Sequence, residues 1–160
     1  MNEVLDFNEK KKNLFVQATK EDPLERHIYR VEVKSGEMEK LTGPEGIHSG
    51  NLSPEGSYFI DRFSGPEVPS EITLVSEKGK KLKKLFAAED PLENYNLGEN
   101  KLVPIQSADG KTDLSGRVIL PPDFDSTKKY PVIVYVYGGP HSQLVTKDWH
   151  NSARWWQYYM

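Results

Sequence analysis

Nucleophilic catalysis on an α/β sheet needs a serine in a Gly-x-Ser-x-Gly turn, which holds the hydroxyl above the sheet edge. None of the serines in this 160-residue chain has that setting. The nearest sequence is Gly46-Ile47-His48-Ser49-Gly50, in which the spacing is wrong. Cysteine is absent as well, so a thiol nucleophile, a zinc–thiolate site and a disulfide are excluded.

The four histidines are His27, His48, His141 and His150. By sequence order, none has a serine and an acid that would complete a catalytic triad. His27 and His48 fall in predicted strands or turns, which favours a structural role. His141 follows a Gly-Gly-Pro loop and is a candidate for the wall of an active site, although a surface-loop role is favoured.

Tyr137 ends an apolar, β-branched run and is followed by Gly138-Gly139-Pro140. A phenol at the end of a strand can donate a hydrogen bond to negative charge that develops on a carbonyl oxygen. The two glycines would let the backbone approach closely. Spacing alone favours a simpler interpretation, a strand-end aromatic side chain with a partly exposed hydroxyl.

The remaining charged groups indicate solvated surface. Glu37 and Glu39 lie on a predicted strand or turn, and Gly43-Pro44-Glu45-Gly46 lacks the spacing and lysine of a phosphate-binding loop. A lysine cluster is typical of an edge strand that resists aggregation; it comprises Lys78, Lys80, Lys81, Lys83 and Lys84. We therefore predict no cofactor and no metal site.

The elements around these residues include an internal repeat. Shifted by 44 residues, Asn13–Val16 aligns with Ser57–Ile60 and Ile28–Val31 with Ile72–Val75. Each repeat contains four short segments of strand character separated by turn residues; in the second they lie near 48–52, 57–62, 71–77 and 81–86. Four antiparallel strands per repeat of this length predict a β-propeller blade, with a small sandwich as the alternative. Because a propeller has about 4–8 blades, two blades cannot close a ring and should expose their side faces.

The pattern changes after about Leu92. Residues 100–105 and 114–120 predict two strands around a turn at 108–111, and 130–137 predicts a strand covered on both faces. Apolar residues at helical spacing in 149–160 predict the start of a helix that packs on this sheet. The expected fold is mainly β: two four-stranded propeller blades in 1–90, followed in 91–160 by a linker and the first strands of an α/β-hydrolase domain.

Two segments carry a family resemblance. Ile119–Gln143, ILPPDFDSTKKYPVIVYVYGGPHSQ, resembles the junction between propeller and catalytic domain in serine peptidases of the prolyl oligopeptidase clan. Leu52–Pro69, LSPEGSYFIDRFSGPEVP, is similar to the last blade in the dipeptidyl peptidase IV branch.

The resemblance implies an enzyme in which a propeller caps a hydrolase domain, and in which a Ser-Asp-His triad releases N-terminal X-Pro dipeptides from peptides. It assigns Tyr137 to the oxyanion hole. The triad would follow Met160, so the chain alone is expected to be inactive. The acidic residues that bind the substrate amine would lie in earlier blades. Two alternatives stay open: a non-catalytic interaction module built from β-blades, and a fragment of an oligopeptidase or acylaminoacyl peptidase.

Composition limits the partners. A net charge of -3 argues against a general nucleic-acid binder, and no apolar run is long enough to span a bilayer. The start, MNEVLDFNEKKK, has no apolar region of a signal peptide, and the chain does not fix the compartment. The resemblance implies that the parent enzyme is periplasmic or secreted. The exposed blade faces predict self-association of the isolated chain.

Overall fold

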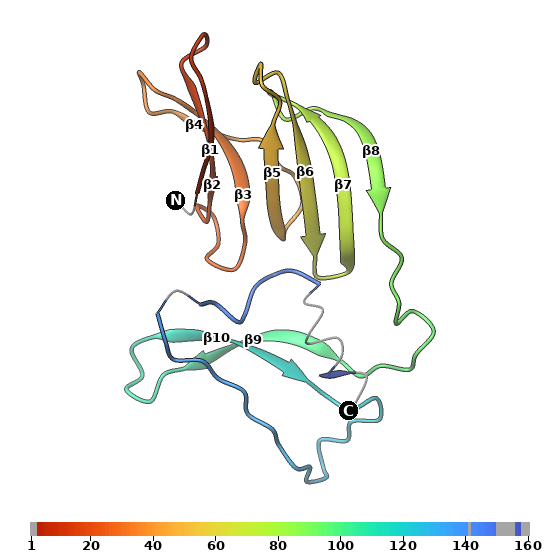
Figure 1. Cartoon of the computed structure of the whole chain (residues 1–160). Helices are drawn as coiled ribbons and strands as arrows, with labels where there is room; N and C mark the ends of the chain where they lie inside the picture. The colour runs from red at the N-terminus through yellow and green to blue at the C-terminus, as the bar shows by residue number, and fades with distance from the viewer. Residues whose placement is uncertain (1–2, 141, 150–155, 158–160) are drawn as a thin grey trace. The chain divides into compact units, whose positions relative to one another are not determined.

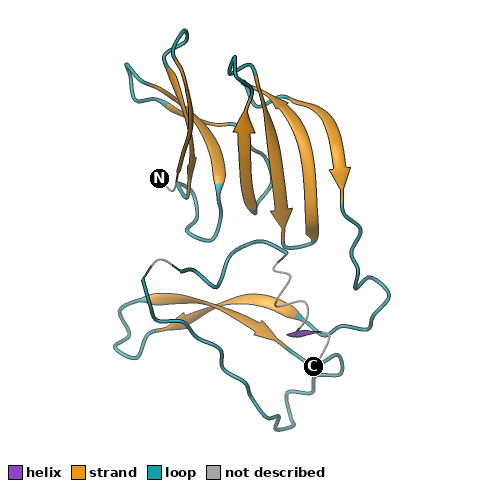
Figure 2. Ribbon diagram, viewed as in Figure 1, coloured by secondary structure: helices purple, strands orange, loops and turns teal. Residues whose placement is uncertain are grey.

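The computed structural model describes residues 3–140, 142–149 and 156–157 (Figure 1). The chain divides into two compact units, which are described separately below. The first unit comprises Met1–Asp90 and Thr146–His150, and the second comprises Pro91–Val145 and Asn151–Met160. Strands dominate the regular structure that is described, as Figure 2 shows.

The first unit contains two sheets of four strands each, and every neighbouring pair is antiparallel. One sheet consists of β1 (Glu3–Asn8), β2 (Asn13–Ala18), β3 (His27–Glu32) and β4 (Met38–Lys40). The other consists of β5 (Ile47–Leu52), β6 (Tyr58–Gly65), β7 (Val68–Ser76) and β8 (Lys81–Ala87). In both sheets the spatial order follows the chain, so the predicted antiparallel strands of the repeat are confirmed.

The main core lies between these two sheets. Its buried members are Phe15 and Ile28 of the first sheet, Phe59 and Val75 of the second, and Leu41, which directly follows β4. Gly50 is required at this contact, because a Cβ there would lie 2.4 Å from the Ile60 carbonyl oxygen and 3.0 Å from Cδ1 of Ile28. A second cluster of Val16, Ala18 and Tyr29 packs on the opposite face of the first sheet. Both faces of β2 are therefore buried.

Backbone hydrogen bonds join the two sheets where β3 and β5 begin. Arg26 and Ile47 form a parallel bridge. The Arg26 N–H donates to the Gly46 carbonyl at 3.0 Å, and the His48 N–H donates to the Arg26 carbonyl at 2.8 Å. These bonds bring His27 and His48 next to each other.

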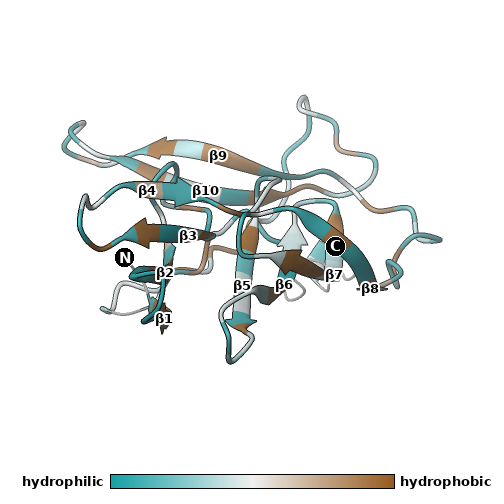
Figure 3. Cartoon of the chain, turned by 90° about the horizontal axis from the view of Figure 1, so that it is seen from above, coloured by the Kyte–Doolittle hydropathy of each residue, from teal (hydrophilic) through white to brown (hydrophobic). Residues whose placement is uncertain are grey.

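Strand β8 is the edge of its sheet and is exposed along its whole length. Its lysines make much of it hydrophilic, as Figure 3 shows. The Lys84 ammonium forms an ion pair with Glu71 on β7 at 2.6 Å. Charges on such an edge disfavour pairing with a foreign strand.

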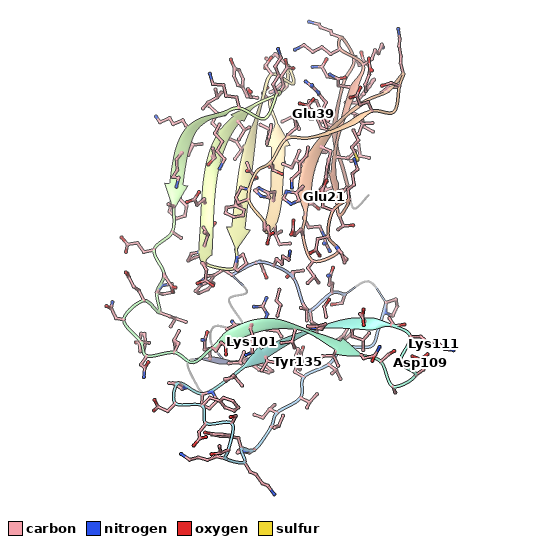
Figure 4. All side chains as sticks on the ribbon, turned by 180° about the vertical axis from the view of Figure 1, so that it is seen from behind. Glu21, Glu39, Lys101, Asp109, Lys111 and Tyr135 are labelled. Atoms are coloured by element: carbon pink, nitrogen blue, oxygen red, sulfur yellow. The ribbon has the colours of Figure 1, made fainter. Side chains whose placement is uncertain are left out.

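The second unit contains an antiparallel hairpin of β9 (Asn100–Gln106) and β10 (Asp113–Ile119), which confirms the two strands predicted there. Asp109 and Lys111 lie at its tip (Figure 4). The Asp109 carboxylate accepts hydrogen bonds from the Ser107 hydroxyl and the Lys111 N–H, and Gly110 has a φ of 69°. The turn is thus closed by its own residues.

The prediction of a covered strand at 130–137 is wrong for this chain. The structure assigns no strand there, and the side chains from Val132 to Val136 are 64–80% exposed. The reason is that a strand of a parallel sheet needs partners from segments distant in sequence, and the described part of the chain offers it none.

The helix predicted over 149–160 falls mostly on residues outside the described ones, although Trp156 and Gln157 are helical. Within the described residues, none of the helices has the length and apolar character that a membrane crossing requires.

Candidate functional site

Tyr137 is the residue for which the sequence suggests a catalytic role. Its side chain is 54% exposed and its backbone lies outside regular structure. The ring folds back over Gly139, where a Cβ would lie 2.6 Å from the Tyr137 hydroxyl oxygen. Gly139 is therefore required for this position of the phenol. His141 and His150 lie outside the described residues.

A neighbouring aromatic contact holds the same segment. The Tyr135 ring meets Trp156 edge to face, with the centroids 5.3 Å apart; Tyr135 is labelled in Figure 4. Tyr135 lies two residues before Tyr137, so this ring contact falls within the exposed run 132–137.

His48 forms a buried pair with Asp61. The Nδ1 atom lies 3.0 Å from both carboxylate oxygens of Asp61, and Nε2 lies 2.9 Å from the Pro44 carbonyl oxygen. Both partners present acceptor oxygens to the ring. The pair is buried within the first unit, where His48 is 0% and Asp61 3% exposed.

His27 stacks on His48 with the ring centroids 5.0 Å apart. Its Nε2 lies 2.8 Å from a Glu25 carboxylate oxygen, and its Nδ1 lies 3.0 Å from the Thr42 hydroxyl. Burial lowers the pKa of His27 below its ordinary value despite the neighbouring Glu25 carboxylate. Lys40 and the adjacent His48 act in the same direction.

Glu25, His27 and Thr42 have the acid–imidazole–hydroxyl order of a catalytic triad. All three are buried, at 5%, 1% and 7% exposure, so no substrate can reach the hydroxyl. The Thr42 oxygen also accepts a hydrogen bond from the Ile28 N–H at 3.2 Å. These contacts make the group a structural one.

The sequence indicates no acid partner for any histidine, whereas the structure places Glu25 beside His27 and Asp61 beside His48. The contact of His48 with Asp61 could have been predicted from the sequence. The predicted strands 48–52 and 57–62 pair as a hairpin, which brings Asp61 close to His48, thirteen residues earlier. No such signal pointed to Lys147, which contacts Asp22, Glu25 and Glu45 more than 100 positions away.

Among the residues that the structure describes, no group of three or more histidine, aspartate and glutamate side chains could hold a metal ion. The polar groups brought together in the first unit bind one another, through hydrogen bonds and ion pairs.

Comparison with known proteins identifies the relationship. Residues 1–70 match the family model described as the dipeptidyl peptidase IV N-terminal region. Dipeptidyl peptidase 4 of Trichophyton equinum is 30% identical over 154 residues, which cover 92% of this chain and 20% of the relative. An Emericella nidulans protein assigned as dipeptidyl-aminopeptidase B is 32% identical over 137 residues, which cover 81% of this chain and 15% of that relative.

Solved structures show the same similarity to dipeptidyl peptidases. A Bacteroides ovatus protein assigned as a dipeptidyl aminopeptidase IV superposes with a TM-score of 0.86 at 42% identity, covering 98% of this chain and 22% of that one. Porphyromonas gingivalis dipeptidyl peptidase 4 superposes with a TM-score of 0.84 at 25% identity, covering 91% of this chain and 21% of that one.

The chain is thus similar in sequence and in fold to dipeptidyl peptidases, and it spans about a fifth of the length of the first curated relatives that it matches. The relatives reported above carry the names dipeptidyl peptidase 4 and dipeptidyl-aminopeptidase B. The predicted resemblance to the dipeptidyl peptidase IV branch is confirmed, and the non-catalytic module and the other branches of the clan are not favoured.

Proposed function

We propose that this chain is part of a serine peptidase that removes X-Pro dipeptides from the N-termini of peptides. The observation that carries the proposal is the similarity to dipeptidyl peptidase IV in both sequence and fold, which extends over nearly the whole chain. The substrate is a peptide with a free N-terminus, as in the enzymes after which those relatives are named.

In this proposal the two four-stranded sheets are propeller blades. Their up-and-down strand order and their packing through Phe15, Ile28 and Phe59 support this interpretation. Residues 1–90 form the blades, and residues 91–160 form the linker and the beginning of an α/β-hydrolase domain. The unpaired run 130–137 supports the second assignment, because its apolar residues suit a central strand of a parallel sheet.

The Tyr137 hydroxyl is proposed to donate a hydrogen bond to the oxyanion of the tetrahedral intermediate. Attack by the serine places negative charge on the substrate carbonyl oxygen, and a donor already positioned there lowers the barrier. The second donor would be the backbone N–H that follows the nucleophile. The 54% exposure of Tyr137 and the bend at Gly139 are compatible with this role.

The 160-residue chain contains no Gly-x-Ser-x-Gly sequence, so it is expected to be inactive alone. Its exposed apolar residues, among them Val132, Ile133 and Val134, are expected to drive self-association. Analytical ultracentrifugation at micromolar concentration tests this expectation, and a clean monomer would contradict it.

The proposal is tested by assaying release of a chromogenic Gly-Pro amide. The test compares the 160-residue chain with a longer protein that continues this reading frame and contains a Gly-x-Ser-x-Gly serine. Turnover is expected only from the longer protein, and substitution of that serine by alanine should abolish it. A longer protein that folds but leaves the amide intact would overturn the proposal. Turnover by the short chain would contradict its expected inactivity.

A further inference from the structure

The segment that follows the Tyr137 region returns to the first unit at Thr146–His150. The Lys147 N–H donates to the Leu24 carbonyl at 2.8 Å, and the Trp149 N–H donates to the Ser64 hydroxyl at 3.2 Å. Trp149 is 5% exposed. Backbone and side chain together fix this short segment on loops and strands that lie far away in sequence.

Lys147 makes the most specific of these contacts. Its ammonium lies 2.8 Å from Asp22, 2.7 Å from Glu25 and 3.4 Å from Glu45. We call these three acidic residues the carboxylate cluster. The side chains of Lys147 and Glu25 are 20% and 6% exposed. An ion pair shielded to this degree is stronger than a pair in open solvent.

The carboxylate cluster is held in place by its own contacts. The Leu24 N–H donates to Asp22 at 2.7 Å, which shapes the loop below the ammonium. The other oxygen of Glu25 binds His27. The hydrogen bond from Lys147 is the main cause of the lowered pKa of Asp22. At Glu25, burial acts against ionisation, but the hydrogen bonds from Lys147 and His27 outweigh it and lower the pKa.

Lys147 lies ten residues after Tyr137. Ten residues span at most roughly 33–36 Å when fully extended, so a fixed Lys147 limits the region that Tyr137 can occupy. The limit matters because the run before Tyr137 is exposed and has no strand partner in the described part of the chain.

We propose that Lys147 is a positioning residue: by binding the carboxylate cluster, it restrains the segment that carries Tyr137. The inference rests on the proposed function for the role of Tyr137, but the restraint itself does not. It acts on the chain whether or not the peptidase assignment is correct.

The restraint is measured directly with a nitroxide label. The chain has no cysteine, so Ser142→Cys provides a single attachment point midway between Tyr137 and Lys147, at an exposed position. Electron paramagnetic resonance compares the labelled chain with and without Lys147→Met. Loss of the immobilised component is expected in Lys147→Met. Lys147→Arg, which keeps the charge, should retain it. Lys129→Met, which removes an exposed lysine on the other side of Tyr137, should leave the spectrum unchanged.

Circular dichroism checks that each variant is folded. If Lys147→Met does not fold, Asp22→Asn takes its place, with Glu45→Gln as the milder companion because Glu45 is 73% exposed. The proposed restraint is refuted if the immobilised component of the spectrum persists in Lys147→Met. If Lys147→Met does not fold, persistence of that component in Asp22→Asn refutes it instead.

The second arm measures kinetics in the longer peptidase. Lys147→Met should lower kcat by about 10²-fold with little change in KM, the size of effect that a misplaced catalytic group produces. Its effect should not add to that of Tyr137→Phe, and Lys147→Arg should restore much of the rate. A released label with an unchanged kcat would show that the restraint does not position Tyr137. A wild-type enzyme without turnover would refute the proposed function, while the label experiment would still decide the restraint.

Discussion

Strand β6 and the run 130–137 are both rich in apolar residues, but they differ in how far those residues are buried. Phe59 and Phe63 of β6 are 1% and 9% exposed, whereas Val132 and Val136 are 80% and 77% exposed. The partners of β6 are β5 and β7, which directly precede and follow it in the chain. An antiparallel meander completes its sheet from adjacent segments, whereas a strand of a parallel sheet depends on distant ones.

The largest expected effect comes from emptying the shared core. Phe59→Ala should lower the free energy of unfolding by about 3–5 kcal/mol, because the lost side chain leaves a cavity between the two sheets. Urea unfolding followed by circular dichroism measures the change. The matched control is Ile133→Ala, at a site that is 77% exposed, where the change should stay within about 0.5 kcal/mol. Equal losses in the two variants would contradict the contrast between the regions.

Breaking the buried pair of the first unit should have the next largest effect. Asp61→Ala removes the acceptor that faces Nδ1 of His48 and leaves a buried donor unpaired. The expected loss is about 1–3 kcal/mol in the free energy of unfolding. Asp123→Ala, on an exposed loop of the second unit, serves as the control. A loss as small as that of the control would mean that the pair does not stabilise the sheets.

Acid should destabilise the first unit in two steps. The pKa of His27 is lowered from 6.5, chiefly by burial, so the unfolded chain binds the proton first and the free energy of unfolding falls as the pH drops below about 6.5. The pKa values of Glu25 and Asp22 are lowered from 4.5 and 3.8, so their contribution is complete above those values and is lost on further acidification. Urea titrations at several pH values measure the profile. The variant His27→Gln should lack the first step, and an unchanged profile in that variant would contradict the assignment.

The smallest effect on stability is expected in the exposed run. Val134→Thr should change the free energy of unfolding by less than about 0.5 kcal/mol, because Val134 is 76% exposed. The same change should weaken self-association, which sedimentation velocity measures. A clear loss of stability would show that the run is packed in solution.

The sequence carries enough information for most of the fold. The 44-residue repeat and the turns at Pro54-Glu55-Gly56 and Lys78-Gly79 define the antiparallel strands, because such strands pair with their neighbours in the chain. The strand predicted at 130–137 is wrong because apolar residues of this kind suit the interior of a parallel sheet, and the described part of the chain contains no partner strands for one. The contacts of Lys147 could not be predicted, since no local pattern relates it to Asp22 or Glu45.

The proposed oxyanion role of Tyr137 is tested most directly by Tyr137→Phe in a longer protein that continues this reading frame. The substitution removes only the hydroxyl, so kcat for a Gly-Pro amide should fall by about 10²–10³-fold while the fold is retained. Circular dichroism and urea unfolding verify the fold. A kcat equal to that of the wild type would contradict that role.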